Sequence, residues 1–169
     1  MSYGDFMGNN AVSDTGPIIH LSEINLLNAL KIFHNVYIPS EVKKELIKNK
    51  IKIPSFLRSL KLNGKFKEVS AILTNKFSLD LGESQAIALA LQEKINYFLT
   101  DDLEAREIAK TYNLEARGTV GIISRSFRDK IIDKKTAIEK IKELHIKSSL
   151  FITKELVSEI IKTILDFKR

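Results

Sequence analysis

Short apolar stretches alternate with longer amphipathic ones along this chain, and turn-forming residues separate them. The short stretches are rich in β-branched and aromatic residues, which predicts strands over residues 11–13, 36–38, 97–100 and 114–116. The longer stretches repeat apolar residues at helical spacing, which predicts helices over residues 24–33, 40–49, 82–94, 103–112, 119–127, 134–145 and 153–167. The pattern over residues 51–79 is the weakest, and one or two amphipathic helices are expected there, from Phe56 to Leu73.

Strands that alternate with helices predict an α/β fold, in which a short parallel sheet carries helices on both faces. The helix over residues 82–94 is apolar on every side from Ala86 to Leu91, so we expect it to be buried. No internal repeat, low-complexity tract or flexible linker divides the chain. Residues 1–169 are therefore predicted to form a single domain.

The composition excludes several classes of protein. Hydrophobic residues make up 44% of the chain and charged residues 28%, which excludes a disordered or collagen-like chain. The absence of cysteine excludes disulfide frameworks, zinc ribbons, iron–sulfur clusters and thiol nucleophiles. Residues 1–10 lack the features of a secretory signal, and no apolar run approaches the ~18 residues that cross a bilayer. A cytoplasmic protein without a membrane partner is expected.

Acidic side chains occur where predicted strands end or helices begin. Asp14 follows the first strand and Asp101 and Asp102 follow the third, while Glu83 and Glu45 lie on the two helices between them. Binding sites of parallel sheets lie at the carboxyl ends of the strands, so these groups are expected to meet there. Carboxylates that lie close together repel one another unless a cation is bound, and Mg²⁺ or Mn²⁺ suits oxygen ligands. Such an ion would stabilise the charge that develops on a phosphodiester.

The same residues also have purely structural explanations. Asp14, before Thr-Gly-Pro, suits an Asx turn or a helix cap. A capping box explains Asp80-x-x-Glu83 and Asp101-x-x-Glu104 equally well. An ion pair with a neighbouring lysine would explain the glutamate on the helix after the second strand. Spacing alone therefore leaves both the metal site and the capping roles open.

Other chemistries fit the chain less well. Asp14-Thr15-Gly16 matches the tripeptide of aspartic proteases, but that enzyme class needs a β-rich scaffold. A phosphatase-type aspartyl nucleophile usually has a second aspartate two residues on, where Gly16 stands. The histidines are too scattered for a zinc pair on one helix, and packing or surface roles are expected for His20, His34 and His145.

Five segments, in order, resemble the PIN-domain family. They are Val12-Ser13-Asp14-Thr15-Gly16-Pro17-Ile18-Ile19-His20-Leu21, Val36-Tyr37-Ile38-Pro39-Ser40-Glu41-Val42 with Glu45, Leu81-Gly82-Glu83-Ser84-Gln85-Ala86-Ile87-Ala88-Leu89-Ala90, Leu99-Thr100-Asp101-Asp102 with Ala105, Arg106 and Ala109, and Gly118-Thr119-Val120-Gly121. The third segment is similar to the variant with a GE…AIALA motif. The resemblance covers about residues 11–128, and a helical C-terminal extension over residues 130–169 lies outside it.

The resemblance implies a three-layer α/β/α sandwich and a ribonuclease that depends on Mg²⁺ or Mn²⁺. Many relatives are VapC-type toxins, usually homodimers, that an acidic antitoxin protein holds inactive. The family's acidic positions fall on Asp14, Glu45, Glu83 and the pair Asp101 and Asp102. The family's Thr-x-Asp spacing selects Asp102 as the fourth position, and its Asp-Asp variant selects Asp101. Glu83 stands where an aspartate is more common.

Charge alternates along the chain in blocks, although the net charge is +6. Residues 31–76 carry 11 basic and 3 acidic side chains, and residues 117–169 carry 13 and 7. The blocks between and before them are acidic. Basic side chains that bind phosphates would position an RNA without reading its sequence. The residues expected to do so are Arg117, Arg125, Arg128 and Lys130.

The leading hypothesis is an endoribonuclease that acts as the toxin of a toxin–antitoxin pair. A PIN-like scaffold that binds RNA or protein without cleavage is one alternative, and a housekeeping nuclease of RNA processing is another. Two adjacent side chains rarely face one ion, so Asp101 and Asp102 are expected to differ. We predict that Asp101 caps the helix over residues 103–112, with Glu104 completing the box, and that Asp102 binds the metal.

Overall fold

The computed structural model describes residues 9–168, and its centre is a sheet of five parallel strands. Along the sheet the order is β3-β2-β1-β4-β5. The strands are β1 (Ala11–Ser13), β2 (Val36–Ile38), β3 (Leu57–Ser59), β4 (Tyr97–Leu99) and β5 (Glu115–Arg117). The helices are α1 (Thr15–Glu23), η1 (Leu27–Ile32, a 3₁₀ helix), α2 (Ser40–Lys48), α3 (Gly64–Phe77), α4 (Leu81–Gln92), α5 (Leu103–Thr111), α6 (Thr119–Arg128), α7 (Lys134–Lys147) and α8 (Lys154–Asp166).

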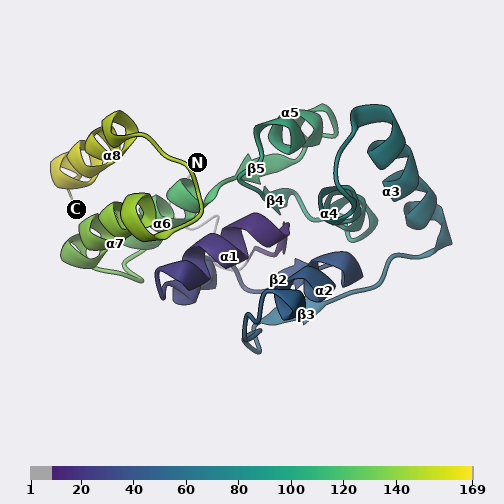
Figure 1. The fold of residues 1–169 in the computed structure, drawn as a ribbon, viewed down its shortest axis with the longest axis horizontal. Helices are drawn as coiled ribbons and strands as arrows, with labels where there is room; N and C mark the ends of the chain where they lie inside the picture. Colours follow the sequence, from purple (N-terminus) through teal and green to yellow (C-terminus); the bar gives the residue numbers. More distant parts are fainter. Residues whose placement is uncertain (1–8, 169) are drawn as a thin grey trace.

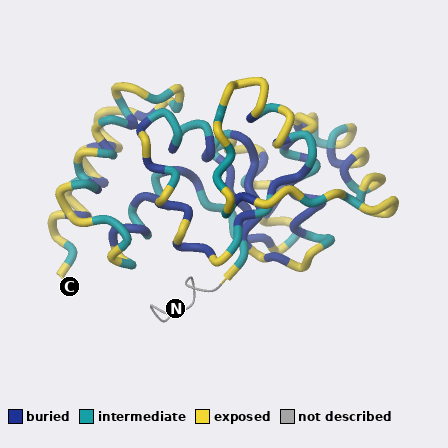
Figure 2. The backbone as a smooth tube through the Cα atoms, turned by 90° about the horizontal axis from the view of Figure 1, so that it is seen from below, coloured by how far each residue is buried: buried dark blue, intermediate teal, exposed yellow. Residues whose placement is uncertain are grey.

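Helices cover both faces of the sheet, which confirms the predicted α/β fold (Figure 1). Successive strand residues point to opposite faces: Tyr97 and Leu99 join one apolar core, and Phe98 joins the other. The first core also receives buried residues of α1, α2, α6, α7 and α8, and the second receives those of α3, α4 and α5. Figure 2 shows the buried backbone concentrated between exposed outer segments.

Helix α4 is the most buried helix of the second core. Residues 86–90 are fully buried because α3 packs on one side of α4 and the sheet lies on the other. This confirms the burial that its apolar sequence predicts. No helix within residues 9–168 is both long enough and apolar enough to cross a membrane.

The last two helices belong to the first core. Ala137, Ile141 and Leu144 of α7 and Ile160 and Ile164 of α8 are at most 9% exposed and pack in the same cluster as the sheet. Helix α7 also packs against α1 and α6. The C-terminal segment therefore completes one face of the fold.

The structure corrects the prediction for the segment after β1. Helix α1 begins at Thr15, whereas the sequence pattern predicted a turn there and a helix only over residues 24–33. Pro17 lies in the first turn of α1, where its missing N–H would have no intrahelical partner in any case. Asn25 has a φ of 52°, which ends α1, and the following residues form only the 3₁₀ helix η1.

The segment from Ile51 to Leu79 also differs from the prediction. The helix expected from Phe56 onward is interrupted, because residues 57–59 form β3 at the edge of the sheet and α3 starts only at Gly64. Only Leu57 of this strand is buried. A short edge strand with one buried side chain has no alternating pattern to recognise.

Candidate active site

The acidic residues meet between two neighbouring strands whose following helices lie on opposite faces of the sheet. β1 and β4 are neighbours, and the helices that follow them pack on opposite faces of the sheet. A crevice at such a point is the usual position of a binding site in an open parallel sheet. The cleft found here has a volume of about 350 Å³, and its lining residues are Asp14, Thr15, Gly16, Ile19, His20, Glu45, Asp80, Glu83, Asp101, Asp102, Ser149, Leu150 and Phe151.

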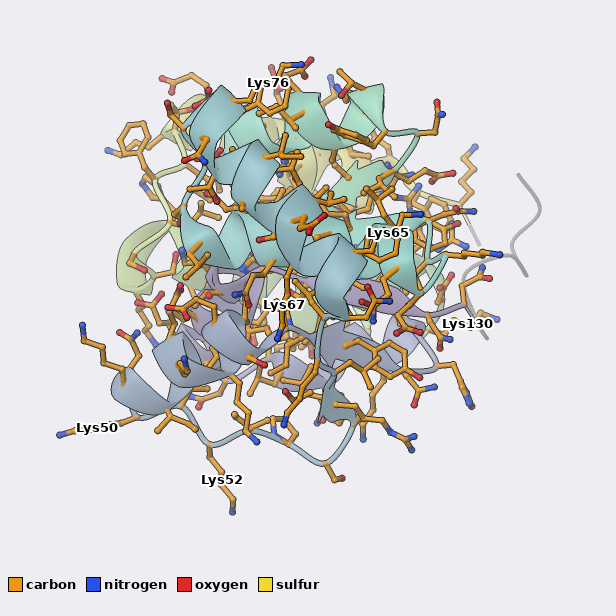
Figure 3. The ribbon with its side chains drawn as sticks, turned by 90° about the vertical axis from the view of Figure 1, so that its right-hand side faces the viewer. Lys50, Lys52, Lys65, Lys67, Lys76 and Lys130 are labelled. Carbon is orange, nitrogen blue, oxygen red and sulfur yellow. The ribbon has the colours of Figure 1, made fainter. Side chains whose placement is uncertain are left out.

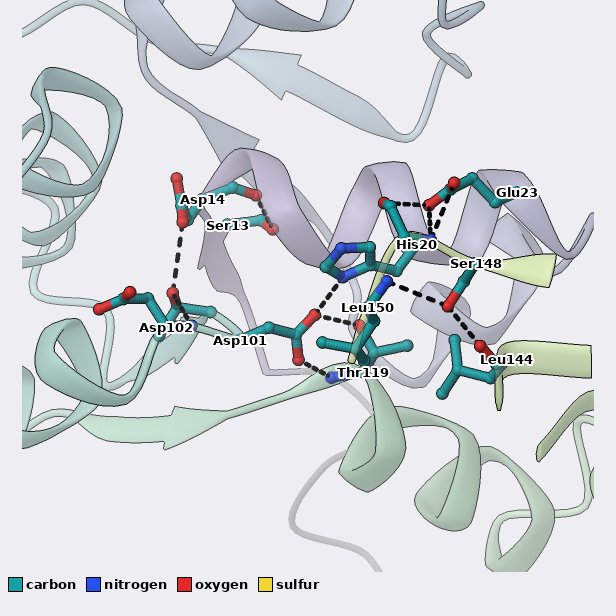
Figure 4. A network of polar contacts seen from close by, with 12 residues as sticks. Ser13, Asp14, His20, Glu23, Asp101, Asp102, Thr119, Leu144, Ser148 and Leu150 are labelled. Carbon is teal, nitrogen blue, oxygen red and sulfur yellow. Dashed lines mark hydrogen bonds and ion pairs between the residues drawn. The ribbon is translucent and has the colours of Figure 1, made fainter. Parts of the chain in front are cut away.

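Asp14 is the most enclosed carboxylate of the cleft. It precedes the first turn of α1, is only 7% exposed, and accepts a hydrogen bond of 3.3 Å from the Thr100 hydroxyl (Figure 4). Burial raises the pKa of Asp14 to about 8, and the negative charges of Asp80, Glu83 and Glu45 add to this effect. A carboxyl group in these surroundings keeps its proton at neutral pH unless a cation is bound.

Glu45 reaches the cleft from α2. Val42 and Leu46 on the same helix are buried in the first core, and this packing holds α2 against α1. The Thr15 hydroxyl donates a hydrogen bond of 2.6 Å to Glu45 Oε2. The beginning of α1 thus supplies the group that orients the Glu45 carboxylate.

Three carboxylates converge beside Gly82, in the first turn of α4. A Cβ atom placed on Gly82 would lie 2.9 Å from Glu45 Oε1, 3.4 Å from Asp80 Oδ1 and 3.5 Å from Asp14 Oδ1. A side chain at this position would occupy the space between these oxygens and displace the end of the Glu45 side chain. The sequence pattern predicted only a capping role for Asp80, and its place beside Asp14 and Glu45 follows from the backbone approach at Gly82.

Glu83 forms the predicted capping box with Asp80. The Glu83 N–H donates to Asp80 Oδ1 at 2.7 Å, and the Asp80 N–H donates to Glu83 Oε2 at 2.9 Å. Partial burial raises the pKa of Glu83 to about 7, with further contributions from Asp80, Asp102 and Glu104. The capping role and a place in the acidic cleft therefore coexist in one residue.

Asp102, and not Asp101, caps α5. Its Oδ1 accepts a hydrogen bond of 2.8 Å from the Ala105 N–H, so the predicted box of Asp101 with Glu104 is wrong. The Asp102 N–H donates to the Thr100 hydroxyl at 3.2 Å. Because that hydroxyl also donates to Asp14, Thr100 links the ends of β1 and β4.

Asp101 points away from the other carboxylates, into a network of polar groups (Figure 4). It accepts hydrogen bonds from the Thr119 N–H at 2.7 Å, from the Thr119 hydroxyl at 2.5 Å and from His20 Nδ1 at 2.6 Å. Burial alone would raise its pKa, but the hydrogen bonds from His20 and Thr119 outweigh burial, so the pKa of Asp101 lies below its usual value. This carboxylate ties the end of β4 to α1 and α6.

Arg106, which belongs to the fourth segment that resembles the PIN family but had no predicted role, completes this network. Its Nε donates to the Thr100 carbonyl at 3.1 Å, and its Nη2 lies 3.7 Å from Asp101 Oδ1. A Cβ atom on Gly118 would lie 1.7 Å from Arg106 Nη2, so only glycine leaves room for the guanidinium. His20 was expected to pack or lie at the surface, and nothing local in the sequence signals its partnership with Asp101, which is 81 residues away.

None of the predicted phosphate-binding residues is among the described residues that line the cleft, although the Arg117 carbonyl accepts a hydrogen bond from the neighbouring Thr100 N–H. Arg125 pairs with Asp129 at 3.0 Å, and Arg117 pairs with Glu115 at 3.1 Å. Arg128 is the last residue of α6, and Lys130 follows the helix. Arg128 lies nine positions after Thr119 along α6, about 13.5 Å at 1.5 Å per residue. A second group of exposed basic residues covers the side formed by α3 and the segment after α2 (Figure 3), namely Lys50, Lys52, Lys65, Lys67 and Lys76.

The donor set of the cleft suits a hard divalent cation. All its acidic groups offer oxygen, which Mg²⁺ and Mn²⁺ prefer, and no cysteine is present in the chain. Within residues 9–168 no three acidic or histidine side chains stand close enough to form a complete coordination group as they are. Three of the carboxylates border the space beside Gly82.

Comparison with known proteins agrees with this geometry. A family model described as a PIN domain matches residues 10–165, from before β1 into α8, and so includes the C-terminal helices. No curated protein and no solved structure matches the chain. PIN domains are generally nucleases. The match covers nearly all of the chain, which therefore belongs to the PIN-domain family.

Proposed function

We propose that this protein is an endoribonuclease that hydrolyses phosphodiester bonds and depends on Mg²⁺ or Mn²⁺. The observation that carries the proposal is the convergence of Asp14, Glu45 and Asp80 on the space beside Gly82. These three residues, with Glu83 and Asp102 at the edge of the cleft, would hold the ion. The ion would supply Lewis-acid stabilisation of the charge that develops on the scissile phosphate.

The chain's own groups would position the attacking water and the side chains that hold the ion. Burial raises the pKa of Glu83 to about 7 in the absence of an ion, so an ion held there would take the place of its proton near neutral pH. The Thr15 and Thr100 hydroxyls orient Glu45 and Asp14. Asp101 is left out of the proposed metal set because Thr119 and His20 already use its oxygens, and we propose that it positions β4 and Asp102.

The experiment that tests this proposal is incubation of the purified protein with mixed RNA, with and without Mn²⁺. We expect cleavage only with the ion and its arrest by a chelator. The same mixture with single-stranded DNA decides whether RNA is the preferred substrate. Cleavage that persists in chelator would contradict the metal requirement. The absence of cleavage of any nucleic acid would favour the alternative of a PIN-like scaffold that binds RNA or protein without cleaving it.

The toxin role extends the proposal to partners. We infer that the protein is the toxin of a toxin–antitoxin pair, that it forms a homodimer, and that an acidic antitoxin covers it. The net charge of +6 and the exposed lysines of α3 support an acidic partner. A small acidic open reading frame next to the gene would favour the toxin over a housekeeping nuclease. Growth arrest on expression, relieved by co-expression of that frame, would test the pair.

Replacing Gly82 by alanine is expected to weaken metal binding without unfolding the protein. The new methyl group would displace the Glu45 carboxylate, because its oxygen lies 2.9 Å from the Cβ position. Alanine is favoured over glycine in helices by about 0.5–1 kcal/mol, so the melting midpoint should not fall. Calorimetric titration with Mn²⁺ should give an affinity about 10- to 100-fold weaker. The matched control is Gly121→Ala in α6, where a Cβ atom meets nothing within 4 Å; equal affinities for both variants would refute the Gly82 space as the metal site.

Asp102→Asn and Asp101→Asn are expected to have opposite effects. Asparagine caps helices as well as aspartate does, so Asp102→Asn should keep the melting midpoint while Mn²⁺-dependent cleavage is lost. Asp101→Asn removes the charge that faces His20 and Arg106 and should cost about 1–3 kcal/mol of stability, with more cleavage retained. Thermal melts and cleavage assays of both variants measure these effects. If Asp101→Asn alone abolished cleavage, the two roles would be exchanged.

We also propose that Arg117, Arg125, Arg128 and Lys130 contact the RNA backbone. Arg125 has a second task, since the Asp129 side chain with which it pairs is only 2% exposed. The test therefore uses Arg128→Ala and Lys130→Ala, whose side chains are exposed. Each phosphate contact that is lost should weaken binding of all RNA sequences alike and reduce the salt dependence of log K by about 0.7. Loss of affinity for one sequence alone would mean that these residues read bases.

A further inference from the structure

The loop between α7 and α8 brings an aromatic side chain to the acidic cleft. Ser149, Leu150 and Phe151 line the same cavity as Asp14 and the other carboxylates. Phe151 is 89% exposed, more than any other large apolar side chain in the described part of the chain. None of the carboxylates needs Phe151 for its position, so the proposed hydrolysis leaves this residue without a role.

The loop that carries Phe151 is held on both sides. Before Phe151, the Glu23 carboxylate of α1 accepts hydrogen bonds of 2.7–3.1 Å from the hydroxyl and the N–H of Ser149. After Phe151, Ile152 is buried in the first core, and its carbonyl accepts a hydrogen bond of 2.9 Å from His145 Nδ1. Figure 4 shows Glu23 and Ser148 on the same side of α1 as His20. The exposed ring therefore stands on a fixed backbone.

The surroundings of Phe151 favour a nucleobase as its ligand. Exposed polar or charged residues surround it in sequence, at Ser149, Thr153, Lys154 and Glu155, and Leu150 is partly buried. A protein-docking surface would need a contiguous apolar patch, whereas the other apolar side chains among the described residues that line this cleft, Ile19 and Leu150, are both partly buried. An unpaired base offers a flat apolar face, and stacking on an aromatic ring is the usual way in which proteins hold single strands.

We propose that Phe151 stacks on an unpaired base of the RNA that lies across the carboxylate cleft, and so restricts the substrate to single strands. This inference rests on the proposed function, because it takes RNA as the ligand of the cleft. In a duplex the faces of the bases are covered by their neighbours, so the ring has no free base on which to stack. Phe151 is thus a specificity-determining residue, fixed by the bond from Ser149 to Glu23.

The absence of tryptophan from the chain permits a direct test. Phe151→Trp introduces a single tryptophan, whose fluorescence should be quenched when a short single-stranded RNA of mixed sequence is added at low salt without divalent ions. The matched control is Ile146→Trp, at a position on α7 that is 77% exposed and does not line the cleft. Its fluorescence should not change. Duplex RNA of the same sequence should quench neither variant.

Binding of the same RNA by alanine variants measures how much Phe151 contributes to RNA affinity. Phe151→Ala should weaken affinity for single-stranded RNA by between about 5-fold and about 150-fold, and Ile146→Ala should not change it. Equal affinities of Phe151→Ala and the unchanged protein, or equal quenching by duplex and single strand, would overturn the inference. Unchanged RNA binding together with loss of a co-purifying protein would also overturn it, in favour of a protein contact.

The outcomes separate this inference from the proposed function. If the RNA quenches Phe151→Trp but is not cleaved with Mn²⁺, stacking stands and the nuclease proposal fails. If Mn²⁺-dependent cleavage occurs at equal rates for Phe151→Ala and for the unchanged protein, on single-stranded and duplex RNA alike, the nuclease proposal stands and stacking fails.

Discussion

Asp14→Asn is expected to lower Mn²⁺-dependent RNA cleavage by on the order of a thousand-fold. The substitution keeps the size of the side chain but removes the negative charge that the other carboxylates and the ion share. Metal ions in hydrolytic sites contribute several kcal/mol to the stabilisation of the transition state, and each 1.36 kcal/mol corresponds to tenfold in rate. Cleavage of a labelled RNA at saturating Mn²⁺, compared between variant and unchanged protein, measures the loss.

The chain offers a control for this variant at another helix start. Asp133 caps α7 by accepting a hydrogen bond of 2.7 Å from the Thr136 N–H, and it does not line the cleft. Asp133→Asn makes the same chemical change at a helix N-terminus, and asparagine caps equally well. Its cleavage rate should match that of the unchanged protein. Full activity of Asp14→Asn would remove the carboxylate cluster from the reaction.

Without divalent ions, the stability of the fold should decrease as the pH rises. The pKa of Asp14 is 3.8 in the unfolded chain and about 8 in the fold, and that of Glu83 moves from 4.5 to about 7. Between those values the folded state holds protons that the unfolded state has released, so unfolding is favoured as the pH increases. The loss begins near pH 4 and is complete above about pH 8, and for a group as buried as Asp14 it amounts to a few kcal/mol at most.

Mn²⁺ should reverse this loss at the alkaline end of the range. An ion that binds only the native state stabilises it by mass action, and its binding releases the protons that Asp14 and Glu83 retain. Urea denaturation across this pH range, with and without Mn²⁺, measures both effects. Asp14→Asn should flatten the pH dependence and should melt higher than the unchanged protein at alkaline pH without metal. An apo protein that is most stable at alkaline pH would contradict the assignment of the buried carboxyl group.

The sequence predicted those parts of the fold in which the local pattern and the tertiary environment agree. Strands β1, β2 and β4 are short apolar runs in the interior of the sheet, and α4 is apolar on all sides because it is buried on all sides. The edge strand β3 escaped prediction because only Leu57 of its residues is buried. Helix α1 escaped because glycine and proline, which usually break helices, occupy its first turn without cost.

For the candidate site too, the sequence predicted some features and missed others. That the carboxylates lie at one edge of the sheet follows from strand order, and the structure does place Asp14, Glu45, Glu83 and Asp102 around one cleft. The distinct roles of Asp101 and Asp102 depend on groups that are far away in sequence, since Thr119 is 18 residues from Asp101. Local spacing favoured the wrong cap for this reason. The position of Asp80 beside Asp14 and Glu45 depends on a close approach of the backbone at Gly82, which the spacing of residues in the sequence does not reveal.

The packing of α8 bears on when the protein becomes functional during its own synthesis. A ribosome releases the chain from its N-terminal end, and domains fold as units as they emerge. Val157, Ile160 and Ile164 belong to the first core, where α8 packs against α7, so that layer stays open until residues 154–166 have left the ribosome. The loop that carries Phe151 is likewise anchored only after the first core has formed, because Ile152 is buried in that core. In this order of folding, the wall of the cleft formed by residues 149–151 is completed only after the segment that follows it, α8, has been synthesised.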